Sequence, residues 1–202
     1  MDNPTLELRF FNQPLHNIYL VGEVGEEMYV NLVKKIDEIR EDDNNVIINN
    51  FSVLQSVGID ISIAPPEINI YINTYGGCVY DMFSIYDMIK GLQKNYVVNI
   101  FCQGKVMSAG TIIMLAVEKK HRFAYSNCTF MFHDLASGKV GKLKDLEEDI
   151  DEAKRLHRMM FQIFKDNTKL PEKILNDMYD CKKDVFLSAK EAKKYGIIDE
   201  IL

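Results

Sequence analysis

The feature that most constrains the fold is a regular alternation of short apolar runs with stretches of helical periodicity. NIYLVGEV (17–24), EINIYIN (67–73), YVVNIFCQ (96–103) and TFMFH (129–133) each have the length and composition of a buried strand. A helix is expected after the first run, where apolar residues recur at helical spacing: Met28, Leu32, Val33, Ile36 and Ile39. This alternation predicts an α/β fold.

Three further helices are expected along the chain. One covers 80–92, after Gly76 and Gly77 end the second strand, and another covers 109–117. The third covers 142–165 and has mostly apolar residues at three- and four-residue steps: Leu143, Leu146, Ile150, Ala153, His157, Met160 and Phe164. His157 is expected to be a packing residue of this seam. This seam is as long as a short coiled coil, but a surface helix packed on its own domain would show it too.

The segment EDDNNVIINNFSVLQSVGIDISIAPP (41–66) separates the first helix from the second strand. Its Asn and Asp clusters and its closing Pro65-Pro66 are typical of a long excursion. We interpret it as a surface insertion, with room for a short strand at 46–48.

Composition limits the classes of function. A chain of 202 residues with 47% hydrophobic residues suits one soluble domain, and its net charge of −6 argues against nucleic acid as the main partner. Its four cysteines are widely spaced, which favours reduced thiols over a zinc site or disulfides. With no signal peptide and no membrane span, a cytoplasmic location is expected.

Ser108 stands between a predicted strand and a predicted helix, within GKVMSAGTIIMLAV (104–117). By itself this stretch favours a helix cap, because serine commonly accepts a hydrogen bond from the first turn. A nucleophile would need a base, an orienting carboxylate and amide donors for an oxyanion. Small residues follow Ser108, and the glycines of the YGG turn (75–77) could direct another amide outward.

Four histidines could supply the base: His16, His121, His133 and His157. Only His133 ends an apolar strand, where a rigid element would present its imidazole to a neighbouring turn. A strand-end histidine in solvent is an equally ordinary reading. With 30 acidic residues in the chain, composition cannot choose the carboxylate.

Five segments, in order, resemble the proteolytic subunit of the Clp protease, the ClpP family. NIYLVGEV resembles the family's first strand, and INTYGG (72–77) stands where the family has I-N-S-P-G-G. GKVMSAGTIIMLA (104–116) resembles the G-Q-A-A-S-M-G segment around the nucleophile, and FMFHD (130–134) resembles V-M-I-H-Q around the base. DVFLSAKEAKKYGIIDEIL (184–202) is close to D-x-F-L-S-A-x-E-A-x-x-Y-G-L-I-D.

The resemblance implies a catalytic triad. Ser108 becomes the nucleophile, His133 the general base and Asp184 the orienting carboxylate, while the backbone amides of Gly77 and Ala109 form the oxyanion hole. The chemistry implied is a serine endopeptidase that needs no metal, no cofactor and no ATP of its own.

The resemblance also implies an architecture. It is a single ClpP/crotonase-like domain over 1–202, built of repeated β-β-α units, with a protruding handle in the region 136–168. Such subunits assemble into homo-oligomers of two stacked heptameric rings, a tetradecamer whose chamber takes polypeptide substrates. The implied partner is an AAA+ unfoldase. Neither nucleic acid nor a membrane is implied as a partner.

The chain departs from the family pattern at several places. Thr74-Tyr75 replaces Ser-Pro before the glycines, Lys183 replaces an arginine used in ring coupling, and the residues before Asn17 lack the axial-loop sequence. Asp134-Leu135 replaces Gln-Pro after the base. Asp134 is therefore a rival for the orienting role, ranked below Asp184 because neighbours on a strand point to opposite faces.

Three other functions remain open at this stage. The chain could be a catalytically inert ring subunit, although such paralogues usually lose a triad member. It could be a crotonase-type acyl-CoA enzyme, which needs two amides but neither Ser108 nor His133. It could also be a Ser–Lys peptidase, if Lys105 reached Ser108 from three residues upstream.

Overall fold

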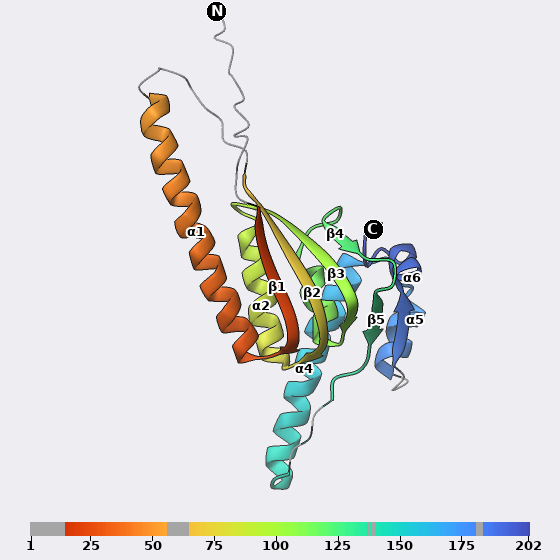
Figure 1. Ribbon diagram of the computed structural model, residues 1–202. Coiled ribbons are helices and arrows are strands. Elements are labelled where there is room, and N and C mark those ends of the chain that lie inside the picture. Colours follow the sequence, from red (N-terminus) through yellow and green to blue (C-terminus); the bar gives the residue numbers. More distant parts are fainter. Residues whose placement is uncertain (1–14, 56–64, 137, 139, 181–183) are drawn as a thin grey trace, which may run out of the picture.

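A computed structural model describes residues 15–55, 65–136, 138, 140–180 and 184–202. Strands and helices alternate along the chain, which confirms the predicted α/β class (Figure 1). In chain order the elements are β1 (His16–Val24), α1 (Glu26–Gln55), β2 (Glu67–Gly77), α2 (Val79–Leu92), β3 (Val97–Met107), α3 (Ala109–Ile113), the 3-10 turn η1 (Met114–Ala116), β4 (Arg122–Ala124), β5 (Thr129–Phe132), α4 (Leu143–Asn167), α5 (Glu172–Asp180), β6 (Val185–Ser188), α6 (Ala189–Lys194) and β7 (Glu200–Ile201).

The strands form one sheet in the order β1-β2-β3-β4-β7. β3 is long enough to pair with two short strands: β4 lies beside residues 100–102 and β5 lies beside residues 105–107. β6 then pairs with β5 and is the one antiparallel neighbour among these strands. The carboxyl end of β3 is therefore brought next to β5, and through β5 next to β6.

Alternate residues of the long strands are buried, as the period of a strand requires. In β3 the buried face carries Val98, Ile100, Cys102 and Val106. The helices α1 and α2 lie along this face of the sheet (Figure 1) and contribute apolar side chains to one core: Met28, Leu32, Ile36, Ile39, Met82, Ile85, Ile89 and Leu92. The periodicity expected for the first helix is thus confirmed.

The opposite face of the sheet carries a row of aromatic rings. Tyr19, Tyr71, Phe101 and Phe123 come from four successive strands and are stacked, with ring centroids 5.1–5.2 Å apart. In-register parallel pairing puts Tyr19 beside Tyr71 and Phe101 beside Phe123, so the row follows from the register. Beyond this row, the same face leads toward the carboxyl ends of β2 and β3.

Two boundary predictions were wrong. The short strand expected at 46–48 is instead part of α1, which continues to Gln55. No Gly or Pro interrupts residues 26–55, so the Asp and Asn cluster does not stop the helix. Asp43 of this cluster accepts a hydrogen bond from Nε2 of the buried His16 on β1, at 2.8 Å, which ties the helix to the sheet.

The second correction concerns Gly76 and Gly77. They were expected to end the strand, but β2 runs through both of them and pairs with β1 as far as Gly77. Parallel pairing with Val24 supplies hydrogen bonds that local glycine propensity cannot anticipate. The helix expected over 109–117 is also divided, into α3 and the turn η1.

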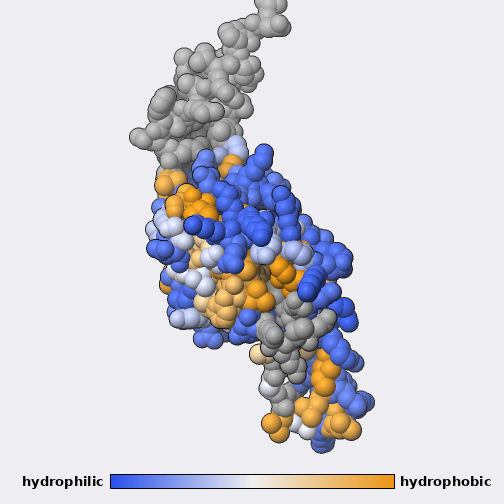
Figure 2. Space-filling model, turned by 90° about the vertical axis from the view of Figure 1, so that its right-hand side faces the viewer, coloured by the Kyte–Doolittle hydropathy of each residue, from blue (hydrophilic) through white to orange (hydrophobic). Residues whose placement is uncertain are grey.

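The long helix α4 projects from the body of the molecule (Figure 1). Its carboxyl-terminal half packs on the core through Leu156, Met160 and Phe164, whereas Leu143 and Ile150 near its beginning are 74% and 54% exposed. Figure 2 shows hydrophobic side chains gathered at the free end of this projection. Of the seven predicted seam residues, only Met160 and Phe164 are therefore buried within the subunit.

A buried arginine donates hydrogen bonds at the carboxyl end of α4. Arg122 on β4 is 1% exposed and donates hydrogen bonds to the carbonyl oxygens of Val117 and Asn167, at 2.6 and 2.9 Å. Burial lowers the pKa of its guanidinium, an effect opposed by the nearby Asp199 carboxylate. Within the described parts of the chain, no helix is long and apolar enough to cross a membrane.

Candidate active site

Ser108 occupies the sharp turn where β3 passes into α3. Its backbone has φ 50° and ψ −123°, a conformation that non-glycine residues rarely adopt. Neighbours hold it there: its N–H donates to the Met131 carbonyl at 2.8 Å, and its carbonyl accepts from the Thr111 amide and hydroxyl at 2.9 and 2.6 Å. Ser108 stands at the N-cap position of α3, as expected, but its side chain makes no capping hydrogen bond.

The glycine turn at the end of β2 lies directly against Ser108. Gly76 has φ +105°, and a Cβ atom there would lie 2.6 Å from Cβ of Ser108. A Cβ atom on Gly77 would collide with the Val24 carbonyl. The two glycines are therefore required by close approach, and they bring the backbone of residue 77 beside the turn that holds Ser108.

One pocket of about 270 Å³ contains most of the predicted site. Ser108, His133, Gly77 and Ala109 all line it. The remaining wall is largely apolar and comes from α2, α3, β5 and α4: Val79, Met82, Ile112, Phe132, Met160 and Phe164. A serine, an imidazole and two backbone amides thus share one concave, mostly apolar site.

Asp184 approaches His133 through the pairing of β5 with β6. The last pair of this antiparallel ladder is Phe132 with Val185, so Asp184 follows opposite His133, one residue further. Asp184 is exposed and does not line the pocket. Among the described residues, no hydrogen bond joins the side chains of Ser108, His133 and Asp184.

Asp134, the rival acid, also lines the pocket but has other hydrogen-bond partners. Its Oδ1 atom lies 3.0 Å from Nδ1 of His157 on α4 and accepts from the Leu135 amide at 2.7 Å. The carboxylate therefore connects the end of β5 to α4 instead of orienting His133. His157, expected to be a packing residue, is a polar partner of this connection.

Lys105 also has other partners than Ser108. Its Nζ atom donates to Oδ1 of Asn73 at 2.8 Å and lies 4.3 Å from the centroid of the Tyr75 ring. Lys105 is not among the residues that line the pocket of Ser108. This placement disfavours a Ser–Lys dyad, for which the ammonium would have to contact the serine hydroxyl.

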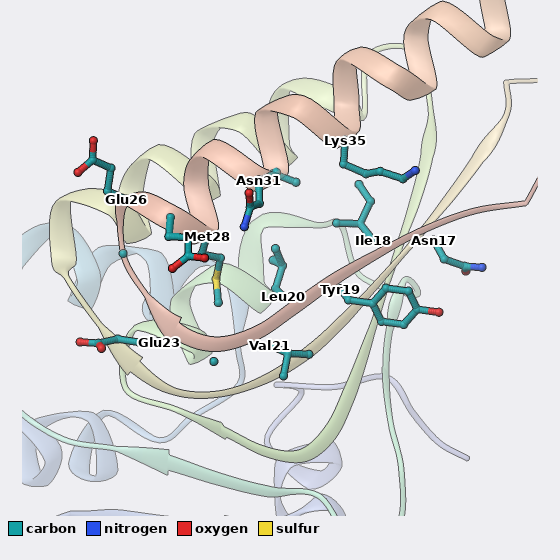
Figure 3. A pocket seen from close by; sticks show the side chains of 14 residues that line it. Asn17, Ile18, Tyr19, Leu20, Val21, Glu23, Glu26, Met28, Asn31 and Lys35 are labelled. Carbon is teal, nitrogen blue, oxygen red and sulfur yellow. The ribbon is translucent and has the colours of Figure 1, made fainter.

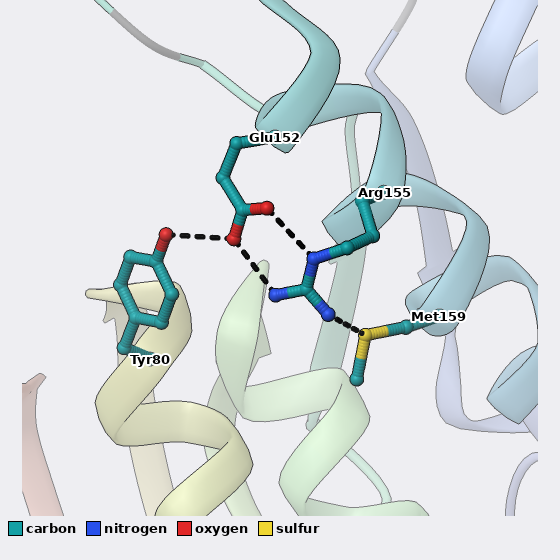
Figure 4. Close-up of polar contacts among 4 residues, drawn as sticks. All are labelled: Tyr80, Glu152, Arg155 and Met159. Atoms are coloured by element: carbon teal, nitrogen blue, oxygen red, sulfur yellow. Dashed lines mark hydrogen bonds and ion pairs between the residues drawn. The ribbon is translucent and has the colours of Figure 1, made fainter. Parts of the chain in front are cut away.

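A polar cluster links the start of α2 to α4 (Figure 4). The hydroxyl of Tyr80 donates to Glu152 at 2.9 Å, and Glu152 also accepts two hydrogen bonds of 2.7 Å from Arg155. Arg155 further contacts the sulfur of Met159 at 3.1 Å. The hydrogen bonds from Arg155 and from Tyr80 lower the pKa of Glu152 to about 2.

Buried cysteines do not compete with Ser108 as nucleophiles. Burial raises the pKa of the Cys128 thiol to about 12 and raises that of Cys102 well above its ordinary value. Both thiols therefore stay protonated at neutral pH. Cys78 is exposed beside Gly77, and Cys181 lies outside the described residues.

A larger hollow of about 730 Å³ lies between β1 and the first turns of α1 (Figure 3). The residues lining it fall between Asn17 and Lys35, and none of them is a serine, cysteine or histidine. In Figure 3, Tyr19 and Val21 of β1 and Asn31 and Lys35 of α1 lie around this hollow. Its volume exceeds that of the pocket at Ser108, but its charged residues are Glu23, Glu26, Glu27 and Lys35, without the serine and histidine of a triad.

Comparison with known proteins decides the family. The Clp protease family model matches residues 17–202. The chain belongs to the Clp protease family. An ATP-dependent Clp protease proteolytic subunit of Deinococcus radiodurans is 36% identical over 154 residues, which are 76% of this chain and 73% of that protein.

A solved structure of the same family agrees with the fold. A mutant of ClpP1 from Listeria monocytogenes superposes with a TM-score of 0.70 at 28% sequence identity. The match covers 93% of this chain and 91% of that one. Both the Clp protease resemblance and the ClpP-like fold expected from the motifs are thereby confirmed.

The structure brings together four of the five predicted site residues of this Clp protease family member. Ser108, His133, Gly77 and Ala109 line one pocket, and Asp184 follows from the β5–β6 register. Lys183 lies outside the described residues. Sequence reasoning missed the contact between Asp134 and His157, since residues 23 positions apart gave no local signal.

Proposed function

We propose that this chain is the proteolytic subunit of a ClpP-type serine protease, in which Ser108, His133 and Asp184 form the catalytic triad. The observation that carries the proposal is the strained turn at Ser108, held against Gly76 and opening into the pocket that His133 also lines. Strained nucleophile turns present a hydroxyl clear of the backbone, where a substrate carbonyl can reach it.

The reaction follows triad chemistry. His133 takes the proton of the Ser108 hydroxyl as its oxygen attacks the peptide carbonyl, and the amides of Gly77 and Ala109 stabilise the oxyanion. Ala109 begins α3, so its N–H has no intrahelical acceptor. When the tetrahedral intermediate collapses, His133 gives the proton to the leaving amine, and water then hydrolyses the acyl-enzyme in the same way.

Asp184 orients the imidazole when its carboxylate accepts from His133. It reaches that position from β6, which holds only four residues and pairs with β5 alone. A small adjustment of this two-stranded edge therefore aligns the acid and the base, and assembly with other subunits would supply it. Apo hydrogen bonds of catalytic groups often tighten only in the working complex.

The assembly we propose is the family's double ring. Leu143 and Ile150 on the exposed half of α4 are apolar residues that are 74% and 54% exposed, as expected of a surface that a second ring buries. Peptide hydrolysis itself needs no ATP, and a separate AAA+ unfoldase would supply unfolded chains. We place this activity in the cytoplasm, in agreement with thiols spaced too widely for a disulfide framework.

Labelling with a fluorophosphonate tests the proposal together with hydrolysis of short fluorogenic peptides. The wild-type oligomer is expected to be labelled and to cleave, whereas Ser108→Ala should lose both, a fall of at least about 1,000-fold, with its oligomer mass unchanged. Equal cleavage by wild type and Ser108→Ala would show that Ser108 is not the nucleophile. A wild-type oligomer that is neither labelled nor active would indicate the inert ring subunit instead.

A further inference from the structure

Lys105 and Tyr75 form a polar pair at the rim of the active-site pocket that the chemistry does not use. Both lie on the outward face of the sheet, Tyr75 on β2 and Lys105 on β3. Tyr75 is 71% exposed and lines the pocket that holds Ser108 and His133. The Lys105 ammonium lies 4.3 Å from the centroid of this ring, close enough for a cation–π contact.

The ammonium is held in place but is not neutralised. Asn73 supplies one acceptor at 2.8 Å and Tyr75 supplies a ring face, while no carboxylate lies within ion-pair distance of Lys105 among the described residues. An ammonium has three donors, so capacity remains for a further acceptor. Lys105 is half-buried, which leaves this capacity open to solvent and to a bound chain.

The carboxylate on the pocket wall does not pair with Lys105. Asp134 is the one carboxylate that lines the pocket, and its Oδ1 atom is paired with His157 on α4. The chain as a whole carries a net charge of −6, so a peptide rich in acidic residues would in general be repelled. Lys105 is thus a local cation, three residues before Ser108, on an acidic protein.

We propose that Lys105 is a specificity-determining residue that favours substrates with an aspartate or glutamate close to the scissile bond. Tyr75 is a positioning residue, because its ring holds the ammonium beside the pocket mouth. Lys105 does not itself line the pocket, so the acidic side chain belongs to a flanking residue of the substrate. The residue at the scissile bond enters the apolar pocket. This inference rests on the proposed peptidase function.

Charge selectivity in matched peptides tests the inference. The substrates are fluorogenic peptides with one leucine before the scissile bond and Gln at the flanking positions, and Glu replaces Gln at one position at a time. At one position the wild-type oligomer should show a kcat/KM for Glu about fivefold above that for Gln, which corresponds to about 1 kcal/mol, and 0.5 M KCl should reduce this ratio.

Variants at position 105 separate charge from structure. Lys105→Gln keeps a donor for Asn73 but removes the charge, so the ratio should fall to about one while cleavage of the all-Gln peptide continues. Lys105→Glu should reverse the preference, and Lys105→Arg should keep it. Lys94→Gln removes a cation from an exposed turn between α2 and β3 and should leave the ratio unchanged.

Variants at position 75 test the positioning role. Tyr75→Phe keeps an aromatic face for the ammonium and should retain the ratio, whereas Tyr75→Leu should lower it. Competition with fluorophosphonate labelling of Ser108 gives a second readout: the Glu peptide should protect the wild-type enzyme at a lower concentration than its Gln counterpart. In Lys105→Gln the two peptides should protect equally.

The outcomes distinguish the two proposals. If cleavage depends on Ser108 but no position shows a Glu preference, or if Lys105→Gln keeps the preference, Lys105 does not determine specificity and the peptidase assignment stands. If no peptide is cleaved in a Ser108-dependent way and Ser108 is not labelled, the proposed function is wrong and the specificity falls with it.

Discussion

The two halves of the candidate site are built in different ways. The nucleophile half lies at the ends of β2 and β3, strands of 11 residues each, where backbone hydrogen bonds and close contacts fix Ser108 and Gly77. The base half lies on β5 and β6, strands of four residues each, and ends in the exposed Asp184. One half is held by two long central strands, and the other ends in an exposed acid next to β6, a short strand that pairs with β5 alone.

This difference indicates how the site could be controlled. A residue fixed by the core keeps its geometry whether or not the subunit is assembled, because opening it would disrupt buried packing. Short strands with few neighbours open or shift at a lower free-energy cost. The alignment of His133 with Asp184, and not the readiness of Ser108, is then the step that assembly would govern.

Replacing the acid should have the largest effect and tests the base half directly. We expect Asp184→Asn to lower kcat/KM for a short peptide by about 1,000-fold, because the amide cannot stabilise the imidazolium or hold its tautomer. Stability should hardly change, since Asp184 is exposed. Peptide hydrolysis and thermal unfolding of the purified oligomer measure the two effects.

Asp134→Asn is the matched control for this prediction. It makes the same chemical change at the neighbouring end of β5, where the carboxylate contacts His157 and not His133. Since Asn can still accept a hydrogen bond, we expect a loss of less than about fivefold. If Asp134→Asn were the more damaging variant, the orienting acid would be Asp134, and the register of β5 with β6 would not place the triad.

A second prediction tests the nucleophile half. In Gly77→Ala the added Cβ atom would collide with the Val24 carbonyl, so the turn must shift and move the amide of residue 77 away from the oxyanion. We expect the rate of peptide cleavage to fall by about 100-fold or more. Gly91→Ala is the control, because a Cβ atom there meets nothing within 4 Å.

The control should also raise stability. Gly91 lies near the carboxyl end of α2, and alanine stabilises a helix by about 0.5–1 kcal/mol relative to glycine. Activity should stay as in the wild type. If Gly77→Ala kept full activity, the amide of Gly77 would not be an oxyanion donor, and the nucleophile half would be less rigid than its contacts indicate.

Much of the fold could be predicted because the long strands carry their own signal. The apolar runs at 17–24 and 96–103 mark β1 and β3 to within a few residues, because aliphatic residues face the core and strand-forming Tyr19 and Phe101 stand on the outward face. β4 and β7 could not be predicted in this way. β4 has three residues and β7 has two, and both form by pairing with strands that are distant in sequence.

The site was predicted more fully than its surroundings. Ser108 and His133 came from motifs, and motifs require no knowledge of packing. The strained φ of Ser108 and the collision that forbids a side chain at Gly77 depend on Met131 and Val24, which are remote in sequence. Lys105 was a candidate base because it is only three residues from Ser108 in the sequence. In the structure its ammonium contacts Asn73 and Tyr75 instead.

The smallest predicted effect concerns a contact between α2, which follows the nucleophile half in the chain, and α4. Tyr80 is the second residue of α2, three residues after Gly77, and its hydroxyl donates to Glu152 on α4 (Figure 4). Hydrogen bonds from Arg155 and Tyr80 lower the pKa of Glu152 from its ordinary 4.5 to about 2. A depressed folded-state pKa means that the contact stabilises the fold above about pH 4.5 and is lost as the pH falls toward 2.

Tyr80→Phe should raise the pKa of Glu152 but leave it below 4.5, because Arg155 makes the larger contribution and stays in place. Carboxyl chemical shifts followed by NMR between pH 2 and pH 6 measure this, with Tyr125→Phe, another exposed tyrosine, as the control. Since the cluster is exposed, peptide cleavage at pH 7 should change by less than about twofold. A larger loss of peptide cleavage would mean that α4 also positions the nucleophile half. The two halves of the site would then respond to assembly together.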